Sequence, residues 1–301
     1  MEGLKNIEFM LQNYFLPFSI LFFILGACIA SFFNVVIFRY PKMLMEAEKE
    51  YMKEYMVENN ITVPRELENN DTNLNLSFPA SHCYSCKTPL KWYHNIPIIS
   101  YIFLRGKCGF CHTKFSIQYP LVELLGGLSL LFSYLFFIPL GTLPFLLGST
   151  FIMICFLLAM IDLKTYLLPD TLTLSLLWIG LIASSLEIFI YTDSLKDSLY
   201  GAITGYLLLW VISTVGKFVK KQEVMGGGDL KLLAAIGAFI GVKGAIFTLF
   251  FSPFIGIFTW LIFKLFKTKE VMVPYGPSLI VASIFFIIYG KKFLNLLGIS
   301  I

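Results

Sequence analysis

Charged residues are scarce in this sequence. Asp, Glu, Lys and Arg make up 14% of the 301 residues, hydrophobic residues make up 57%, and the mean hydropathy is +0.77. This composition lies outside the range of soluble globular domains. The net charge is only +4 and is not gathered into a basic patch, so nucleic acid is not expected as a partner. The composition indicates an integral membrane protein whose partner is the lipid bilayer.

The hydrophobic residues fall into eight long runs that Pro, Gly and Lys interrupt. The predicted spans are residues 14–38, 119–138, 144–161, 171–190, 197–216, 230–241, 244–263 and 277–289. Several are short for a hydrocarbon core of ~30 Å. We therefore expect an all-α integral membrane protein of about eight transmembrane helices. Its domains would be the first span (1–40), a small cytoplasmic zinc-ribbon-like insertion (41–118) and a seven-span core (119–301).

Between the first two spans the sequence becomes polar. Residues 43–60 are rich in Glu, Lys and Met and predict an exposed or interfacial helix, and an Asn-rich loop follows up to residue 75. The cysteines come next, as two pairs with 21 residues between them, Cys83-x2-Cys86 and Cys108-x2-Cys111. This spacing is typical of a four-thiolate structural zinc site. Two disulfides are the alternative, and they would require an oxidising compartment.

The lysines indicate how the chain is oriented in the membrane. They follow predicted spans at Lys217, Lys220 and Lys221, and again at Lys264, Lys267 and Lys269, whereas the turn at 137–142 carries no charge. Lysine-rich loops favour the cytoplasmic side. With eight spans, the cysteine module and the turn at 162–170 then also lie in the cytoplasm. A reducing compartment favours zinc over disulfides.

Two carboxylates border apolar runs on the same predicted membrane face. Asp162 ends the run that begins at residue 145, and Asp229 follows Gly226, Gly227 and Gly228 at the start of another. An ionisable group at membrane depth costs roughly 2.5–3.5 kcal/mol on insertion scales, which indicates a functional site. At a helix C-terminus the charge of Asp162 also opposes the helix dipole. Asp229 has an ordinary alternative as a helix N-cap, and Asp170 is interpreted as an N-cap first.

Two neighbouring carboxyl groups suit acid–base chemistry. Because like charges at close range do not both ionise, the pair shares a proton, so that one group activates water while the other polarises a carbonyl. The three glycines before Asp229 lack Cβ atoms, so they can take positive φ and let an extended substrate backbone approach closely. The sequence thus predicts Asp162 and Asp229 as catalytic and Gly226, Gly227 and Gly228 as the substrate-approach loop.

These motifs resemble a known family. Ala159-Met160-Ile161-Asp162-Leu163 with Leu168-Pro169-Asp170, followed by Gly226-Gly227-Gly228-Asp229-Leu230-Lys231, is similar to the paired aspartate motifs of the type IV prepilin leader peptidases, which are GxGD-type aspartic membrane proteases. The likeness extends to residues 31–39, to the cysteine module, to 95–97 and 119–124, and to Pro274-Tyr275-Gly276-Pro277. Ala30 stands where the family often has glycine.

The resemblance implies cleavage of a short basic leader after a glycine, at the cytoplasmic face of the bacterial inner membrane. Prepilins and pilin-like proteins would be the substrates. It further implies N-methylation of the new terminal residue with S-adenosyl-L-methionine, because members with the cysteine loop usually perform both reactions. No glycine-rich nucleotide fingerprint marks a methyl-donor site, so its residues are not assigned from the sequence.

Other functions compete with this one. A presenilin-like intramembrane protease would use the same aspartates without needing the cysteine module. A proton-coupled transporter would place its acids at midplane within inverted repeats, which the sequence does not show. A zinc-stabilised assembly protein leaves Asp162 unexplained. Glu123, at the start of the second span, has either a function or a favourable dipole interaction, and Lys231 is first interpreted as an interfacial lysine whose side chain extends to water.

Overall fold

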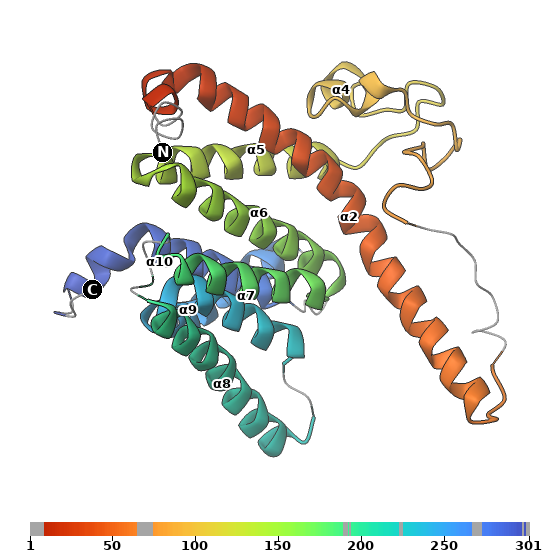
Figure 1. Cartoon of the computed structure of the whole chain (residues 1–301). Helices are drawn as coiled ribbons and strands as arrows, with labels where there is room; N and C mark the ends of the chain where they lie inside the picture. The colour runs from red at the N-terminus through yellow and green to blue at the C-terminus, as the bar shows by residue number, and fades with distance from the viewer. Residues whose placement is uncertain are drawn as a thin grey trace. The chain divides into compact units, whose positions relative to one another are not determined.

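A computed structural model of the chain describes residues 9–64, 75–188, 192, 194–222, 225–266, 273–296 and 298. These residues form helices and connecting segments, with two isolated β-bridges and no β-strand among them. The helices are α2 (Phe15–Glu58), η1 (Trp92–Asn95), α4 (Ile99–Phe103), α5 (Gln118–Phe137), η2 (Ile138–Leu140), α6 (Thr142–Thr165), α7 (Asp170–Ser185), α8 (Leu195–Lys220), α9 (Gly227–Phe266) and α10 (Gly276–Leu296) (Figure 1). The all-helical class predicted from composition is confirmed.

Six helices in the described part of the chain are long and apolar enough to cross a membrane: α2, α5, α6, α8, α9 and α10. Each of the eight predicted spans lies on a helix for most of its length, although 171–190 extends past the end of α7 and its residues 189 and 190 lie outside the described part of the chain. Two features explain why fewer long helices than predicted spans are found. α7 is apolar and has only 16 residues, and α9 contains two predicted spans in one 40-residue element. The structure therefore describes a multi-pass membrane protein.

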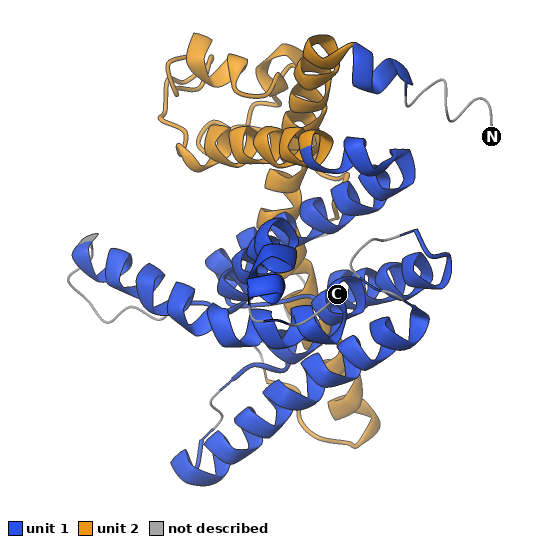
Figure 2. Cartoon of the chain, turned by 90° about the vertical axis from the view of Figure 1, so that its left-hand side faces the viewer, with its two compact units in different colours: residues 1–13, 136–301 blue, residues 14–135 orange. Residues whose placement is uncertain are grey.

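The chain divides into two compact units (Figure 2). The N-terminal unit comprises residues 14–135. The C-terminal unit comprises residues 136–301 together with residues 1–13. The aspartate motifs lie in the C-terminal unit, whereas all four cysteines of the module lie in the N-terminal unit.

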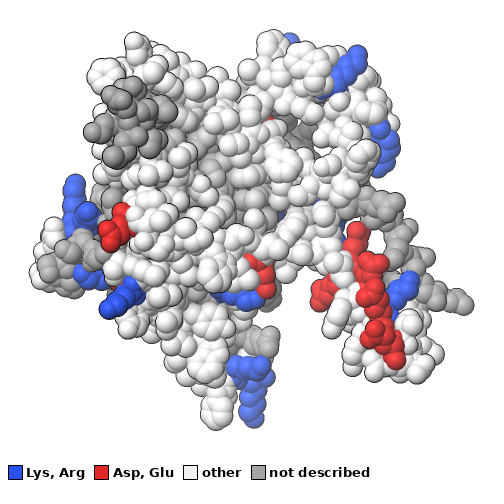
Figure 3. Space-filling view, in the orientation of Figure 1, with Lys and Arg blue, Asp and Glu red and all other residues white. Residues whose placement is uncertain are grey.

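One long helix begins the N-terminal unit. The sequence predicted a span at 14–38 and a separate helix at 43–60, but α2 continues without interruption through Pro41 to Glu58. A proline inside a helix removes one backbone hydrogen bond, and the helix formers that follow it are sufficient to continue the helix here. The polar half of α2 exposes a row of carboxylates (Figure 3).

Small residues let α2 and α5 approach closely within the N-terminal unit. A Cβ added at Gly26 would lie 2.6 Å from the carbonyl oxygen of Gly126, and one added at Gly126 would overlap the side chain of Ala30. Ala30 is itself fully buried. Small residues at such crossings bring helix backbones together in membranes. The alanine that replaces the family's common glycine is thus accommodated opposite another glycine.

In the C-terminal unit, α9 packs against α7, α8 and α10. The backbones of α8 and α9 contact each other directly. A Cβ at Gly201 would collide with the carbonyl oxygen of Gly237, and a Cβ at Gly237 would collide with the carbonyl oxygen of Gly201. On another side of α9, the ring of Phe239 lies 4.8 Å from the ring of Phe151 of α6. These contacts bury the first half of α9 almost completely.

α9 is interrupted at Gly241, whose φ of 70° is not helical. The side chain of Asp197, in the first turn of α8, accepts a hydrogen bond from the Val242 backbone N–H at 3.3 Å, and a Cβ at Gly241 would overlap this carboxylate. Only glycine combines this φ with that contact at no steric cost. The break divides α9 close to the predicted boundary between residues 241 and 244.

Replacing Gly237 with alanine tests the α8–α9 crossing. We expect Gly237→Ala to lower the free energy of unfolding by about 1–3 kcal/mol, because the added methyl group must displace the backbone of α8. The measurement is thermal unfolding in detergent. Gly256→Ala is the matched control, since its Cβ would lie 3.5 Å from the nearest atom, the Ser278 hydroxyl oxygen, and should leave the melting temperature unchanged or raise it.

Candidate active site

Asp162 lies in the last turn of α6 and is only 4% exposed. The helix ends four residues later at Tyr166, a left-handed residue whose N–H donates to the carbonyl oxygen of Asp162 at 2.9 Å. The carboxylate itself accepts a hydrogen bond at Oδ2 from the backbone N–H of Gly276, at 3.0 Å. Gly276 is the first residue of α10. The end of α6 and the beginning of α10 thus meet at this side chain.

Asp229 is half-buried in the first turn of α9. It is close enough to Asp162 for the two charges to interact. The N-cap interpretation of Asp229 is wrong, because the helix already begins at Gly227 and the Asp229 N–H donates back to Gly226. The structure therefore brings together the two carboxylates that the sequence singled out.

The glycines before Asp229 differ from the expectation in their backbone conformation. Positive φ was predicted, but Gly226, Gly227 and Gly228 do not have it, and the last two are helical. The space around the three glycines bears on whether a substrate backbone can approach them. A Cβ at Gly227 would meet nothing within 4 Å, and one at Gly226 only Asp229 Oδ2 at 3.9 Å. At Gly228 a Cβ would lie 2.8 Å from that of Leu168, so this glycine serves packing.

Asp170 is not an N-cap either. Pro169 occupies the N-cap position of α7, and the Asp170 side chain forms an ion pair with Lys231, with both carboxylate oxygens 2.6–2.7 Å from Nζ. Lys231, interpreted from the sequence as an interfacial lysine extending to water, is engaged in this pair. The pair is largely exposed and joins the start of α7 to the start of α9. Asp170 is therefore paired with Lys231 and does not belong to the Asp162–Asp229 pair.

Two neighbours of the aspartates were not identified from the sequence. The N–H of Gly276 holds Asp162, and a Cβ at this glycine would lie 2.6 Å from Asp162 Oδ2. Tyr275 carries a hydroxyl 2.6 Å from that of Ser252, and its side chain interacts electrostatically with Asp229. The motif Pro274-Tyr275-Gly276-Pro277 was noticed in the sequence. Because it lies far from Asp162 and Asp229 in the chain, its contacts with them were not predicted.

In the N-terminal unit, the four cysteines converge from two equivalent turns. Their sulfur atoms all lie within 4.8 Å of one another. In each turn the N–H of the first cysteine donates to a threonine carbonyl, from Cys83 to Thr88 at 3.0 Å and from Cys108 to Thr113 at 2.8 Å. The residue after the second cysteine, Lys87 or His112, takes positive φ in each. The repeated geometry identifies two matching knuckles.

The cluster fits a tetrahedral zinc ion and does not fit disulfides. All four cysteines are free, and the Sγ atoms of Cys83 and Cys111 lie 3.7 Å apart. A Zn–S distance of about 2.3 Å gives a tetrahedral edge of about 3.8 Å. Hydrogen bonding with the side chain and backbone of Thr113 lowers the pKa of the Cys111 thiol to about 6, whereas the pKa of the Cys83 thiol is raised to about 11, with burial as the largest cause that raises it. These four residues could therefore hold a zinc ion.

Comparison with known proteins identifies the family of the chain. Residues 24–137 match the bacterial peptidase A24 N-terminal domain, and residues 149–261 match the type IV leader peptidase family. The chain belongs to the type IV leader peptidase family. The second match contains both Asp162 and Asp229, and the first contains all four cysteines of the cluster. No solved structure matches the chain significantly.

Curated relatives of this leader peptidase family member cover most of its length. It is 36% identical to a prepilin leader peptidase/N-methyltransferase of Pectobacterium carotovorum subsp. carotovorum, over 87% of this chain and 90% of the relative. Proteins of the same name from Neisseria gonorrhoeae and Stutzerimonas stutzeri are 36% and 35% identical, over 88% and 95% of this chain and 89% and 95% of the relatives.

The cysteine geometry of this leader peptidase family member predicts its metal content. We expect the purified protein to contain about one zinc per chain, and Cys108→Ser with Cys111→Ser to remove it, because the remaining two thiolates do not complete a tetrahedral site. Elemental analysis measures the content. Cys28→Ser, which changes an exposed cysteine outside the cluster, is the control. Metal-free protein with two intact disulfides would contradict the assignment.

Proposed function

We propose that this protein is a prepilin leader peptidase that also N-methylates its product. Asp162 and Asp229 would cleave the leader peptides of type IV prepilins and pilin-like proteins, and a methyl group from S-adenosyl-L-methionine would then be added to the new N-terminal residue. The observation that carries the proposal is the proximity of the two carboxylates, one in the last turn of α6 and the other in the first turn of α9. The names of the curated relatives support the same pair of reactions.

Peptide hydrolysis follows from the two carboxyl groups. One of them, ionised, takes a proton from water, while the other, protonated, donates a hydrogen bond to the scissile carbonyl. The Gly276 N–H occupies Oδ2 of Asp162 and fixes the orientation of that carboxyl group. The open space at Gly226 and Gly227 lies directly before Asp229, so an extended substrate segment has room beside the carboxylate.

The proposal includes a location for the aspartates at the cytoplasmic face of the inner membrane. Asp162 and Asp229 lie at helix ends, not at the centres of their apolar helices, as cleavage of a soluble leader requires. Lys217 and Lys220 in the last turn of α8 favour a cytoplasmic location for that end. Lys267 and Lys269, which also supported this orientation, lie outside the described residues. With α7 crossing and α9 crossing twice around Gly241, the chain would have eight spans.

The methyl-transfer reaction is assigned to the N-terminal unit. This unit contains the soluble cysteine module, and the aspartate pair lies wholly in the other unit. Zinc bound by the four cysteines would hold the module in shape. A presenilin-like protease or a transporter has no use for such a module, and neither is among the curated relatives reported above.

The aspartate assignment predicts a specific pattern of lost activity. We expect Asp162→Asn and Asp229→Asn each to reduce prepilin cleavage at least ~100-fold, because an amide has nearly the same shape but does not accept or supply the proton. The measurement is leader removal by each purified variant, followed by mass spectrometry. Asp170→Asn is the matched control. It removes an exposed ion pair worth about 0–1 kcal/mol and should retain most of the activity.

The separation of the two reactions predicts a second pattern. We expect Cys83→Ser with Cys86→Ser to impair methyl transfer and protein yield more than leader cleavage, since structural zinc supplies an apparent ~10–16 kcal/mol to a small module. Asp162→Asn should still methylate a pilin that has already been cleaved. The measurement is transfer of labelled methyl groups from S-adenosyl-L-methionine to that pilin. If folded Asp162→Asn does not transfer them, one shared site performs both reactions.

A further inference from the structure

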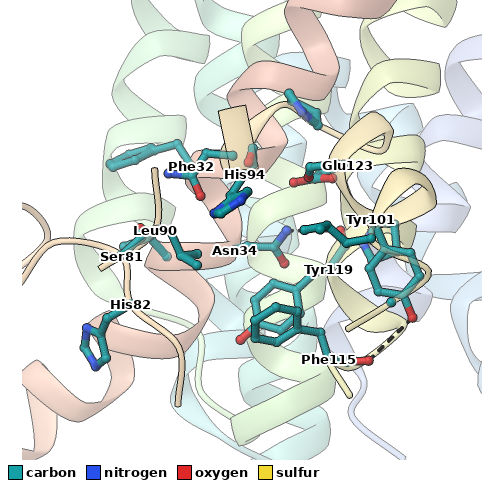
Figure 4. A pocket seen from close by; sticks show the side chains of 18 of the residues that line it. Phe32, Asn34, Ser81, His82, Leu90, His94, Tyr101, Phe115, Tyr119 and Glu123 are labelled. Atoms are coloured by element: carbon teal, nitrogen blue, oxygen red, sulfur yellow. Dashed lines mark hydrogen bonds between the residues drawn. The ribbon is translucent and has the colours of Figure 1, made fainter. Parts of the chain in front are cut away.

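The N-terminal unit contains a cavity of about 480 Å³ between α2, the cysteine module and the beginning of α5 (Figure 4). None of the residues that line it belongs to the C-terminal unit with the aspartate pair. Its volume lies within the range of small-molecule sites, which are mostly apolar with a few placed polar groups. Phe32, Phe38 and Tyr119 contribute aromatic surface, and the rings of Phe38 and Tyr119 stack at 5.4 Å.

Two polar atoms of the cavity lining are buried without a hydrogen-bond partner. One is Oδ1 of Asn34, a residue only 4% exposed, whose amide nitrogen donates to the Tyr119 carbonyl at 3.1 Å. The other is Nδ1 of His94. Leaving a buried polar atom unpaired costs free energy, so such atoms in a cavity indicate a ligand that supplies the missing bonds.

Glu123 adds a carboxylate to the same cavity. Its Oε2 accepts a hydrogen bond from the Ile98 N–H at 2.8 Å, and the Ser31 side chain lies close enough to interact with the carboxylate. A carboxylate has about four acceptor positions, so capacity remains. Among the described residues, no lysine or arginine forms an ion pair with Glu123. The nearby Arg39 instead donates to the backbone carbonyl oxygens of Asn75 and Pro79. Figure 4 shows Glu123 and His94 facing the same space.

We propose that this cavity is the methyl-transfer site and that Glu123 binds the α-ammonium group of the cleaved substrate and takes its proton. The inference rests on the proposed methyltransferase function and adds to it the site and the base. A carboxylate that forms no ion pair, accepts a hydrogen bond from the Ile98 N–H and lines a cavity with aromatic walls is suited to receive a single positive charge. An α-amino group is largely protonated at neutral pH and has no free lone pair until it loses a proton.

The proposed methyl transfer needs one group that accepts a proton. Glu123 accepts the proton of the α-ammonium group and passes it to water. The freed nitrogen lone pair forms the new N–C bond as the C–S bond breaks, and the electron pair of that bond stays on sulfur. S-Adenosyl-L-methionine supplies the activated methyl group when bound. The stacked rings of Phe38 and Tyr119 offer aromatic faces to a sulfonium cation.

The test compares Glu123→Gln with wild type as full-length protein in detergent. Glutamine keeps an oxygen for the Ile98 N–H but does not accept the proton. We expect methyl transfer to a cleaved pilin to fall roughly 100-fold or more. By calorimetry, wild type should bind a peptide with the free mature N-terminus about tenfold more tightly than its N-acetylated form, and the variant should lose this preference. Glu50→Gln, an exposed carboxylate of the same unit, is the matched control.

Binding of S-adenosylhomocysteine separates the possible failures. If wild type binds neither this compound nor the free-amine peptide, the proposed methyltransferase function fails. If Glu123→Gln still methylates normally or keeps the amine preference, only the role of Glu123 is overturned. If Glu123→Gln no longer binds S-adenosylhomocysteine, Ser31→Ala decides, because it keeps the carboxylate and removes a neighbouring hydroxyl group that interacts with it. Slower methyl transfer with normal S-adenosylhomocysteine binding then supports the proposal, and an unchanged rate overturns it.

Discussion

The hydrogen bond from the Gly276 N–H to Asp162 is the interaction on which the C-terminal unit depends. A carboxylate at the end of α6 faces the negative end of its own helix dipole and is almost fully buried, so its position is unfavourable unless something compensates. The beginning of α10 supplies this compensation, because the first N–H groups of a helix have no partner within it and carry partial positive charge. Joining the end of one helix to the start of another places Asp162 beside Asp229 at the start of α9.

Glycine is required at the closest contacts around this arrangement. A side chain at Gly276 would enter the space of the Asp162 carboxylate, and one at Gly228 would displace Leu168. At these two positions the absence of a side chain permits close packing near the aspartates, whereas Gly227 has open space around it. The three-glycine motif therefore combines packing with access. Backbone freedom at positive φ, the reason inferred from the sequence, is used instead at Gly241, where the chain breaks α9.

Local patterns in the sequence predicted the helices and the cysteine cluster correctly. Contacts between segments far apart in the chain were not predicted. Hydrophobic runs marked the helices, and the spacing of the cysteines marked their cluster, since both depend on residues near one another in the chain. Asp162 was identified because its position at a helix end contradicts a simple electrostatic rule. The partner of Asp170 was missed because Lys231 lies 61 residues away. The continuity of α2 through Pro41 was also missed, because the energetic cost of one proline is smaller than the preference of the surrounding helix.

The two proposed reactions need different chemical groups, which gives a physical reason for two sites. Hydrolysis needs a water molecule at the carboxylates, and the open space before Asp229 provides access at the end of its helix. Methyl transfer needs a deprotonated amine, and the cavity offers one carboxylate beside aromatic walls to take that proton. The cysteine module contributes part of the wall, including His82 and Leu90, next to the first knuckle. A module of this size has too small a core to hold such a wall by itself, so metal binding at the four thiolates and the shape of the cavity depend on one another.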